Sequence, residues 1–370
     1  MSGAERDTAM RSFLDAAGWR HSKAEMLPGD ASSRRYIRLI KGRHSAMLMD
    51  QPQNVEAPLA DANATPQERH RLGYNAVARL AGANCERFVA AAEYLQACGL
   101  AAPDIYAADT ENGFLLLEDL GDNLYADALV SGANERELYA AAIDALVAIH
   151  SQPAPATLSG IPLFDYDETA LLAEIDLLTE WFLPVALGRP TDANEKAEHR
   201  NLWKNALEAI RTESRVFVHR DYHAQNLIWM PDRLGVSRVG MVDFQDAVAG
   251  HPAYDLISLL EDARRDVPSA LADEMTAYYL ARSNLQSSTE EFRTAAAILA
   301  AQRNAKIIGI FSRLAQRDKK PFYLKHLPRV WRYMERDLEN HALDNLRTWY
   351  ERMVPREARF GTVRGQEERR

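Results

Sequence analysis

Residues 215–246, RVFVHRDYHAQNLIWMPDRLGVSRVGMVDFQD, constrain the fold of this chain more than any other stretch. An apolar run leads into a polar loop that contains Asp221 and, five residues later, Asn226. Two further apolar runs flank a turn at 231–235, and the second of them ends in Asp243. Short apolar runs bounded by turn residues are typical of strands. The stretch therefore predicts a strand, a polar loop and a hairpin that ends in a carboxylate.

The polar residues of this stretch match the needs of phosphoryl transfer, which depends on positioning and charge neutralisation. One carboxylate must orient the attacking hydroxyl group or accept its proton, and Asp221 is placed for that role. Mg²⁺ prefers hard oxygen ligands, and Asn226 and Asp243 supply an amide oxygen and a second carboxylate. Without such a role, the same residues would only cap the turns of a polar hairpin.

The charge balance narrows the class of partner. The chain of 370 residues has a net charge of −9, which argues against a nucleic acid or an anionic membrane as partner. No apolar run approaches the roughly 20 residues that a membrane-spanning helix needs, and the N-terminus lacks the layout of a signal peptide. Cys85 and Cys98 form neither a metal pattern nor a disulfide framework. We therefore expect a cytoplasmic protein, and a monomer.

The chain before Asp119 predicts a small antiparallel sheet with helices around it. The expected strands lie at 25–28, 34–40, 46–50, 104–107 and 114–118, and the expected helices at 5–18, 65–80 and 86–98. The helix at 65–80 starts with a capping box, Thr65 and Glu68. Between the first two strands, the small residues Gly29–Ser33 offer backbone N–H groups and hydroxyl groups to phosphate oxygens. The sequence assigns no role to the segment 51–82.

Beyond residue 122, nearly everything outside the stretch 215–246 has helical periodicity. The expected helices lie at 134–150, 166–187, 192–212, 253–265, 269–282, 289–316, 327–340 and 341–353. We therefore predict an α+β protein with a nucleotide-binding lobe at 1–119, a catalytic and substrate-binding lobe at 120–355, and a charged tail at 356–370. The active cleft is expected between the lobes.

The motif H-R-D-x-x-x-x-N, followed by D-F at the end of a strand, resembles the catalytic loop and the metal-binding aspartate of protein kinases. Together with FLLLEDLGD at 114–122 and MVDFQDAVAGHPAYDL at 241–256, it resembles the aminoglycoside phosphotransferase and choline kinase family. Within that family, GDASSRRYIRL at 29–39 and DFQDAVAGHPAYDLISLLEDARR at 243–265 resemble the anomeric sugar kinases of bacterial cell-wall recycling. Those enzymes phosphorylate C1 of N-acetylmuramate and N-acetylglucosamine. The resemblance covers residues 5–345.

The resemblance implies a two-lobed protein-kinase-like fold with a five-stranded antiparallel N-lobe and a mainly helical C-lobe. It also implies ATP, Mg²⁺ and a small-molecule sugar as ligands. Asp221 would act on the sugar hydroxyl group, while Asn226 and Asp243 would hold Mg²⁺. The backbone of Glu118–Leu120 would meet the adenine edge, and Asp255 would brace the catalytic loop.

One residue of the kinase pattern is missing. Most kinases carry a lysine on the third strand for the nucleotide phosphates, but here Met49 stands at the aligned position. Either another cation substitutes for it, with Arg34 and Arg35 as the nearest candidates, or nucleotide binding is weak. The nucleotide-binding candidates are Ser32, Ser33, Arg34, Arg35, Glu118 and Leu120. The sugar-binding candidates are His223, Gln225, Asp246 and Arg303.

Other functions remain compatible with this pattern. The same fold acts on aminoglycosides, choline and homoserine, and such cationic acceptors need acidic or aromatic residues in the C-lobe. The missing lysine is also compatible with a catalytically weak kinase-like binding module, although such a module has no need of two metal ligands. Zinc hydrolysis through His219 and His223 is a further alternative, but the segment lacks a helical apolar face and the H-E-x-x-H motif.

Overall fold

The structure is a computed structural model that describes residues 3–28, 34–52, 59–80, 85–210 and 215–360. These residues form two compact units, each built from segments that are distant in the sequence. Unit 1 comprises Met1–Ile149, Pro155–Phe164 and Ala224–Ala247, and unit 2 comprises His150–Ala154, Asp165–His223 and Val248–Arg370. The chain thus passes from one unit to the other within the stretch 215–246. The predicted lobe boundary at residues 119 and 120 stays a prediction.

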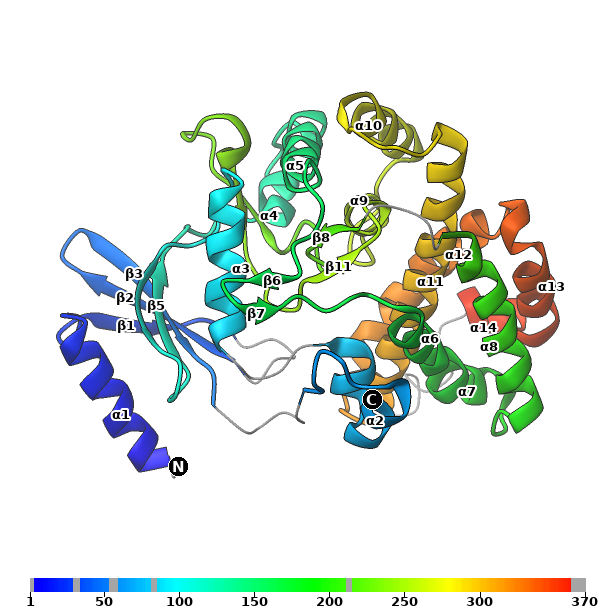
Figure 1. Ribbon diagram of the computed structural model, residues 1–370, viewed down its shortest axis with the longest axis horizontal. Helices are drawn as coiled ribbons and strands as arrows, with labels where there is room; N and C mark the ends of the chain where they lie inside the picture. Colours follow the sequence, from blue (N-terminus) through cyan, green and yellow to red (C-terminus); the bar gives the residue numbers. More distant parts are fainter. Residues whose placement is uncertain (1–2, 29–33, 53–58, 81–84, 211–214, 361–370) are drawn as a thin grey trace, which may run out of the picture. The chain divides into compact units, whose positions relative to one another are not determined.

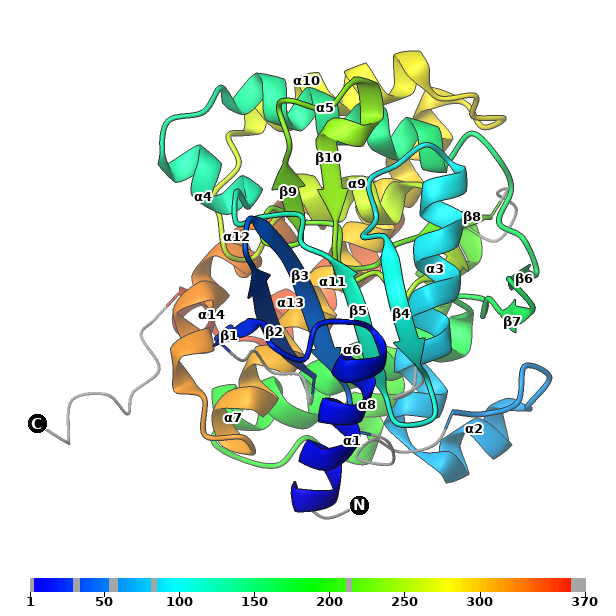
Figure 2. The ribbon, with the colours of Figure 1, turned by 90° about the vertical axis from the view of Figure 1, so that its left-hand side faces the viewer.

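Unit 1 contains the predicted five-stranded antiparallel sheet, with strand order β1-β2-β3-β5-β4 (Figure 1). Its strands are β1 (Lys23–Met26), β2 (Arg35–Lys41), β3 (His44–Asp50), β4 (Ile105–Asp109) and β5 (Phe114–Glu118). Because side chains alternate along a strand, one face collects Leu39, Leu48 and Leu116 as a buried core. Phe13 and Leu14 of α1 (Gly3–Ala16) pack on that core, and Figure 2 looks onto the face that α1 covers.

Besides the segment 65–80, the described part of unit 1 contains further helices and two hairpins. They are α3 (Cys85–Ala97), α4 (Tyr125–Val130), α5 (Glu135–Ile149), β6 (Thr157–Leu158) with β7 (Ile161–Pro162), and β9 (Leu227–Trp229) with β10 (Val239–Met241). Figure 1 shows α3 on the opposite side of the sheet from α1. The hairpin of β9 and β10 confirms the prediction from the apolar runs on either side of the turn at 231–235.

The segment 65–80 is not the single helix that we predicted. The capping box of Thr65 is confirmed, but α2 (Pro66–Leu72) ends at Gly73, whose φ of 97° takes the chain out of the helix. A π-helical turn, Asn75–Arg79, follows and ends at Leu80. The prediction was wrong because the capping box indicates where a helix starts but not where it ends, and the backbone leaves the helix at Gly73.

Unit 2 contains the strand that precedes the predicted catalytic loop, residues 219–226. β8 (Val216–Val218) pairs antiparallel with β11 (Val248–Gly250), so that Val218 lies opposite Val248 and Val216 opposite Gly250. Sequence analysis missed β11 because Val-Ala-Gly is too short and too small to stand out as a strand. The pair fixes the position of the residues that follow each strand: the catalytic loop after β8, and α9 (Ala253–Leu260) after β11.

Helices make up the rest of unit 2. They are α6 (Glu168–Leu177), α7 (Leu183–Leu187), α8 (Ala193–Leu207), α10 (Ser269–Arg282), α11 (Thr289–Gln316), α12 (Leu327–Asp337), α13 (Asp344–Met353) and α14 (Arg356–Phe360). The predicted helix at 166–187 is divided, because a π-helical turn, Leu178–Phe182, separates α6 from α7. Among the described residues, no helix is long and apolar enough to cross a membrane.

Helix α11 packs against α6, α9 and α12. The closest approach is at Gly309, where an added Cβ atom would lie 2.5 Å from the backbone carbonyl carbon of Leu177. Only glycine fits this approach, since real Cβ atoms do not come so close to other heavy atoms. Gly309 therefore sets how closely α11 packs on the end of α6.

Candidate active site

Asn226 and Asp243 lie side by side in unit 1. The backbone carbonyl oxygen of Asn226 accepts a hydrogen bond from the N–H group of Val242 at 3.1 Å, which brings the start of β9 to the end of β10. The backbone of Asp243 has a φ of 64°, a left-handed conformation that is uncommon outside glycine. Its side chain is 42% exposed, so the carboxylate is open to a ligand. The amide and carboxylate oxygens fit the ligand preference of Mg²⁺.

Arg34 is the cation that stands beside this pair. Its Nη1 lies 3.1 Å from Oδ1 of Asp243, and its guanidinium group is almost completely buried. Burial works against the charge, but the neighbouring Tyr36, Asp243 and Asp246 outweigh it and raise the pKa of Arg34 above its usual value. The predicted substitute for the missing lysine therefore lies at the predicted metal ligand.

The other nucleotide candidates near the first strands have different placements. Arg35 pairs with Asp50 of β3, which also accepts a hydrogen bond from Nε of Arg6 at 2.8 Å. This places Arg35 in a different ion pair from Arg34. Met49, at the position of the missing lysine, is completely buried in β3. Ser32 and Ser33 lie outside the described residues.

A second arginine reaches the same loop. Nε of Arg79, from the π-helical turn, lies 2.8 Å from Oδ2 of Asp246. Asp246 was a sugar-binding candidate, and the structure gives it a cationic partner within unit 1. Sequence reasoning missed Arg79, because nothing in the pattern of residues 66–80 relates it to a loop 167 residues further along the chain.

A pocket of about 330 Å³ in unit 1 has the chemistry of an adenine site. Apolar side chains form much of its wall, and the segment that follows β5 forms its polar edge. Its lining includes Tyr36, Met47, Phe88, Leu117, Leu120 and Ile228. The N–H group of Glu118 donates to the carbonyl oxygen of Asp104 at 2.8 Å, which makes the N–H group of Leu120 the better candidate for the adenine edge.

Arg38 connects the sheet to the segment after β5. Its Nε lies 2.8 Å from Oδ2 of Asp119, and its Nη1 lies 2.7 Å from Oδ2 of Asp122. Arg38, Asp119 and Asp122 all line the pocket. The arginine thus holds both ends of the short turn that carries Leu120.

Unit 2 contains the start of the predicted catalytic loop, and Asp255 of α9 braces it as predicted. The carboxylate of Asp255 accepts hydrogen bonds from the backbone N–H groups of His219 at 2.6 Å and Arg220 at 2.9 Å. Arg220 has a φ of 74°, so the loop turns sharply just before Asp221. His219 is completely buried, in agreement with a structural role. These contacts fix the backbone from which the side chain of Asp221 projects.

Glu174 of α6 collects two cations in the interior of unit 2. Its Oε1 lies 2.7 Å from Nη2 of Arg220 and 2.8 Å from Nζ of Lys306, which is on α11. Tyr166 donates its hydroxyl hydrogen to Oε2. Burial disfavours the charged form of Glu174, but Lys306 and Arg220 outweigh that effect and lower its pKa. The single negative charge of Glu174 therefore balances only one of the two positive charges, which belong to Arg220 and Lys306.

Asp221 supplies the second negative charge. Burial disfavours its ionised form, but Lys306, His223 and Arg220 outweigh burial and lower the pKa of Asp221 below its usual value. The carboxylate is therefore ionised at neutral pH, in the state needed to accept a proton or orient a hydroxyl group. Lys306 makes the largest contribution among these charges, and sequence analysis gave it no catalytic role.

The remaining sugar-binding candidates differ in accessibility. The side chain of His223 is buried, with Nε2 3.3 Å from Nη1 of Arg264. Arg303 is also buried, and it donates to Oγ of Ser258 at 2.9 Å and to the carbonyl oxygen of Glu261 at 3.3 Å. Those internal bonds favour a structural role for Arg303. Gln225 is exposed and belongs to unit 1.

The zinc alternative can be compared with the described residues. Among them, no group of three or more His, Cys, Asp and Glu side chains could hold a metal ion, so zinc hydrolysis through His219 and His223 lacks a third ligand.

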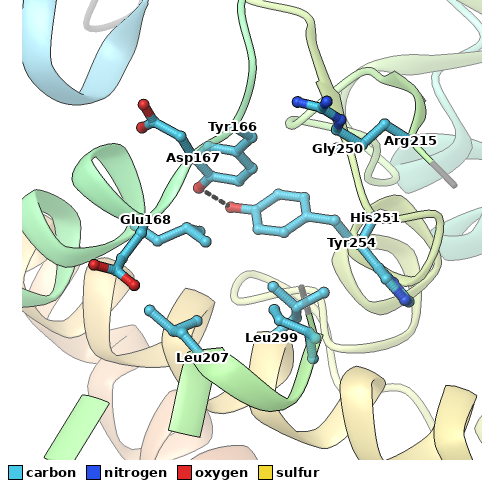
Figure 3. A pocket seen from close by; sticks show the side chains of 11 residues that line it. Tyr166, Asp167, Glu168, Leu207, Arg215, Gly250, His251, Tyr254 and Leu299 are labelled. Carbon is cyan, nitrogen blue, oxygen red and sulfur yellow. Dashed lines mark hydrogen bonds between the residues drawn. The ribbon is translucent and has the colours of Figure 1, made fainter. Parts of the chain in front are cut away.

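Unit 2 also contains a pocket of about 520 Å³, in whose wall the hydroxyl groups of Tyr166 and Tyr254 are hydrogen-bonded (Figure 3). Its lining residue Gly250 pairs with Val216, at the end of β8 away from the catalytic loop.

Comparison with known sequences gives a consistent result. The phosphotransferase enzyme family matches residues 23–292. A protein from Caulobacter vibrioides named N-acetylmuramate/N-acetylglucosamine kinase is 45% identical over 360 residues, which are 96% of this chain and 98% of that protein. A protein of the same name from Pseudomonas aeruginosa is 34% identical and covers 89% of this chain and 88% of its own length.

Solved structures confirm the predicted fold class. Choline kinase LicA from Streptococcus pneumoniae superposes with a TM-score of 0.56 at 15% identity, covering 89% of this chain and 99% of that chain. An ADP-bound aminoglycoside phosphotransferase superposes with a TM-score of 0.54 at 16% identity, covering 90% of this chain and 97% of that chain. At such identities the similarity concerns the fold, and it leaves the acceptor open.

Proposed function

The chain belongs to the phosphotransferase enzyme family, and on that premise we propose that it transfers the γ-phosphoryl group of ATP to the anomeric hydroxyl group of N-acetylmuramate and N-acetylglucosamine. The observation that carries the choice of substrate is the 45% identity to the Caulobacter vibrioides kinase of that name, which extends over 96% of this chain. The motif residues Asp221, Asn226 and Asp243 support the reaction type.

In the proposed reaction, Asp221 accepts the proton of the anomeric hydroxyl group. The C1 oxygen forms a bond to the γ-phosphorus atom while the bond from that phosphorus to the β,γ-bridging oxygen breaks, and ADP leaves. The product is a sugar 1-phosphate, and the proton passes from Asp221 to solvent. The lowered pKa of Asp221 keeps the carboxylate ionised before the acceptor arrives, so that it can orient the hydroxyl group as a hydrogen-bond acceptor until the proton is transferred. Asp255 keeps the loop in place.

Asn226 and Asp243 are the residues that would hold Mg²⁺. Their side chains offer hard oxygen atoms on adjacent backbone segments, and the carboxylate of Asp243 is partly exposed. A bound Mg²⁺ ion supplies positive charge against the nucleotide phosphates. Arg34 contacts Asp243 from its buried position and takes the place of the strand lysine as the fixed cation of this site.

The nucleotide base would occupy the pocket of unit 1. Its apolar walls suit the faces of adenine, and the N–H group of Leu120 suits the ring edge. Of the other predicted nucleotide residues, Arg35 forms an ion pair with Asp50, and the N–H group of Glu118 donates a hydrogen bond to the carbonyl oxygen of Asp104. This arrangement supports adenine recognition by Leu120 and phosphate recognition by Arg34.

The charges around Asp221 do not decide between an anionic and a cationic acceptor. Lys306 and Arg220 lie in its environment, but both pair with Glu174, and Asp221 adds a second negative charge. Arg264 faces the adjacent His223, and Asp262 also acts on that imidazole. The choice of a sugar over an aminoglycoside or choline therefore rests on the sequence identity to the Caulobacter vibrioides kinase.

The test is an ATP-consumption assay with Mg²⁺ across N-acetylmuramate, N-acetylglucosamine, glucose, choline, homoserine and kanamycin, with ³¹P NMR of the product. We expect a sugar 1-phosphate from the two N-acetylated sugars. Asp221→Asn is expected to bind ATP like the wild type and to lose activity by several orders of magnitude. Turnover of kanamycin or choline alone would overturn the acceptor, and ATP binding without any turnover would favour a binding module.

A further inference from the structure

The segment Pro66–Leu80 is built to hold one arginine side chain in a fixed position. Helix α2 ends at Gly73, and the backbone then forms a π-helical turn instead of continuing the helix. Leu80, which ends the turn, has a φ of 55°, a left-handed conformation that disfavours a branched side chain. Single π-helical turns and strained non-glycine residues occur preferentially at functional sites. The last residue of this turn is Arg79.

A second arginine holds the turn from inside. Arg69 of α2 is buried, and its Nε and Nη2 donate to the carbonyl oxygens of Ala76 at 3.1 Å and Val77 at 2.6 Å. A charged side chain is rarely buried unless it satisfies several acceptors. Ala76, Val77 and Ala78 are themselves buried. The π-helical turn is therefore fixed both by the packing of its side chains and by the hydrogen bonds from Arg69 to its carbonyl oxygens.

Arg79 uses this support to reach Asp246. The ion pair joins Nε of Arg79 to Oδ2 of Asp246 at 2.8 Å, with both side chains mostly buried. Asp246 follows Asp243 by three residues, and Asp243 is paired with Arg34. The loop 243–246 thus presents two carboxylates, and each of them has its own arginine. Asp246 nevertheless lies close enough to Arg34 to affect its charge.

We propose that Arg79 is a positioning residue of the nucleotide site, which neutralises Asp246 and so reserves Arg34 for Asp243. Without Arg79, Arg34 would be shared by two carboxylates, and the loop beside the metal ligand would carry an additional negative charge. That charge would repel the phosphates of MgATP. Within the segment 51–82, to which the sequence assigned no role, residues 66–80 would then serve to supply this cation. The inference rests on the proposed function, because it assigns ATP to this loop.

The test measures MgATP binding by calorimetry, without any acceptor. We expect Arg79→Gln to weaken MgATP binding about tenfold or more, because it leaves a charged partner uncompensated. The double variant Arg79→Gln with Asp246→Asn is expected to recover most of the loss, because it removes both charges together. Arg71→Gln is the matched control, since Arg71 is exposed on α2, and it is expected to bind MgATP like the wild type.

The double variant separates this role from its rivals. If Arg79 contacted the phosphates directly, Asp246→Asn would not restore binding. Unchanged binding in Arg79→Gln would also overturn the proposal. If Arg79→Gln does not fold, Arg79→Lys replaces it in the test, because lysine keeps the positive charge. MgATP binding close to that of the wild type would then support the proposal. A tenfold or greater loss of MgATP binding in Arg79→Lys would overturn it. Since binding needs no sugar, these results do not depend on which acceptor the enzyme phosphorylates.

Discussion

The carboxylate of Asp255 lies 2.6 Å from the backbone nitrogen of His219, and both residues are completely buried. The bond connects the first turn of α9 to the start of the catalytic loop. Backbone N–H groups in the interior must find an acceptor, and α9 supplies one carboxylate for two of them. The loop therefore keeps its shape without help from a ligand.

Replacement of Asp255 by asparagine tests this brace. The amide offers one acceptor oxygen where the carboxylate offers two, so a buried N–H group is left unpaired. We expect the free energy of unfolding to fall by about 1–3 kcal/mol, measured by urea denaturation. Asp273→Asn, an exposed change on α10, is the control and should leave stability unchanged. Equal stability of Asp255→Asn and the wild type would show that the brace contributes nothing.

Lys306 controls the charge of Asp221, and its effect can be read from the pH dependence of activity. Its positive charge lowers the pKa of Asp221, so removal of the charge raises that pKa. We expect Lys306→Gln to move the acid limb of the kcat/KM profile to higher pH, whereas Lys306→Arg should leave it closer to the wild-type position. Lys196→Gln, an exposed change on α8, serves as the control. A loss of activity with an unmoved acid limb would mean that Lys306 acts only through Glu174.

His199 makes the stability of unit 2 sensitive to acid. Burial lowers the pKa of His199 to about 3, and its Nε2 accepts the indole N–H group of Trp203 at 3.0 Å, so the ring is neutral in the fold. Below its unfolded pKa of about 6.5, the unfolded chain binds a proton that the folded chain does not bind, so stability falls as pH falls. The loss continues down to about pH 3, at up to about 1.4 kcal/mol per pH unit.

The comparison variant is His199→Gln, which cannot titrate. Urea denaturation at several pH values between 7 and 4.5 should show that the wild type loses more stability over this range than the variant does. The exposed His21→Gln change should leave the pH dependence as it is in the wild type. If the free energy of unfolding changed with pH in the same way for His199→Gln and the wild type, the imidazole of His199 would not be held neutral by burial.

Arg38 is expected to affect nucleotide binding more than catalysis. Its guanidinium group holds Asp119 and Asp122 on both sides of Leu120, so its loss frees the turn that carries the candidate adenine donor. We expect Arg38→Gln to raise the KM for ATP several-fold, with kcat and the KM for the sugar near their wild-type values. Arg43→Gln, in the exposed turn between β2 and β3, is the control. A fall in kcat alone would place Arg38 outside nucleotide recognition.

The sequence was most informative where function depends on residues close together in the chain. The apolar runs on either side of the turn at 231–235 predicted the hairpin, and the capping box at Thr65 predicted the start of α2. Both patterns are local, because a turn or a helix start depends on a few neighbouring residues. Asp255 was identified through a resemblance to a family, and its hydrogen bonds agree with the predicted role.

Contacts between distant residues were not accessible from the pattern. Glu174 and Lys306 meet because α6 packs on α11, and periodicity shows that a helix has a buried face but not which helix it faces. Arg79 was missed for the same reason. The end of α2 at Gly73 did leave a signal, since a glycine inside a helical pattern lowers the expectation of a continuous helix.

The close packing of α11 on α6 has a consequence for which substitutions this enzyme tolerates. Gly309 lets the helix sit against the backbone of Leu177, and Lys306 lies one turn earlier on the same helix. A methyl group at position 309 would lift the helix away from α6, and the ammonium group of Lys306 would withdraw from Glu174 with it. The distance over which the charge of Lys306 acts on Asp221 is thus fixed by a residue that has no functional group of its own.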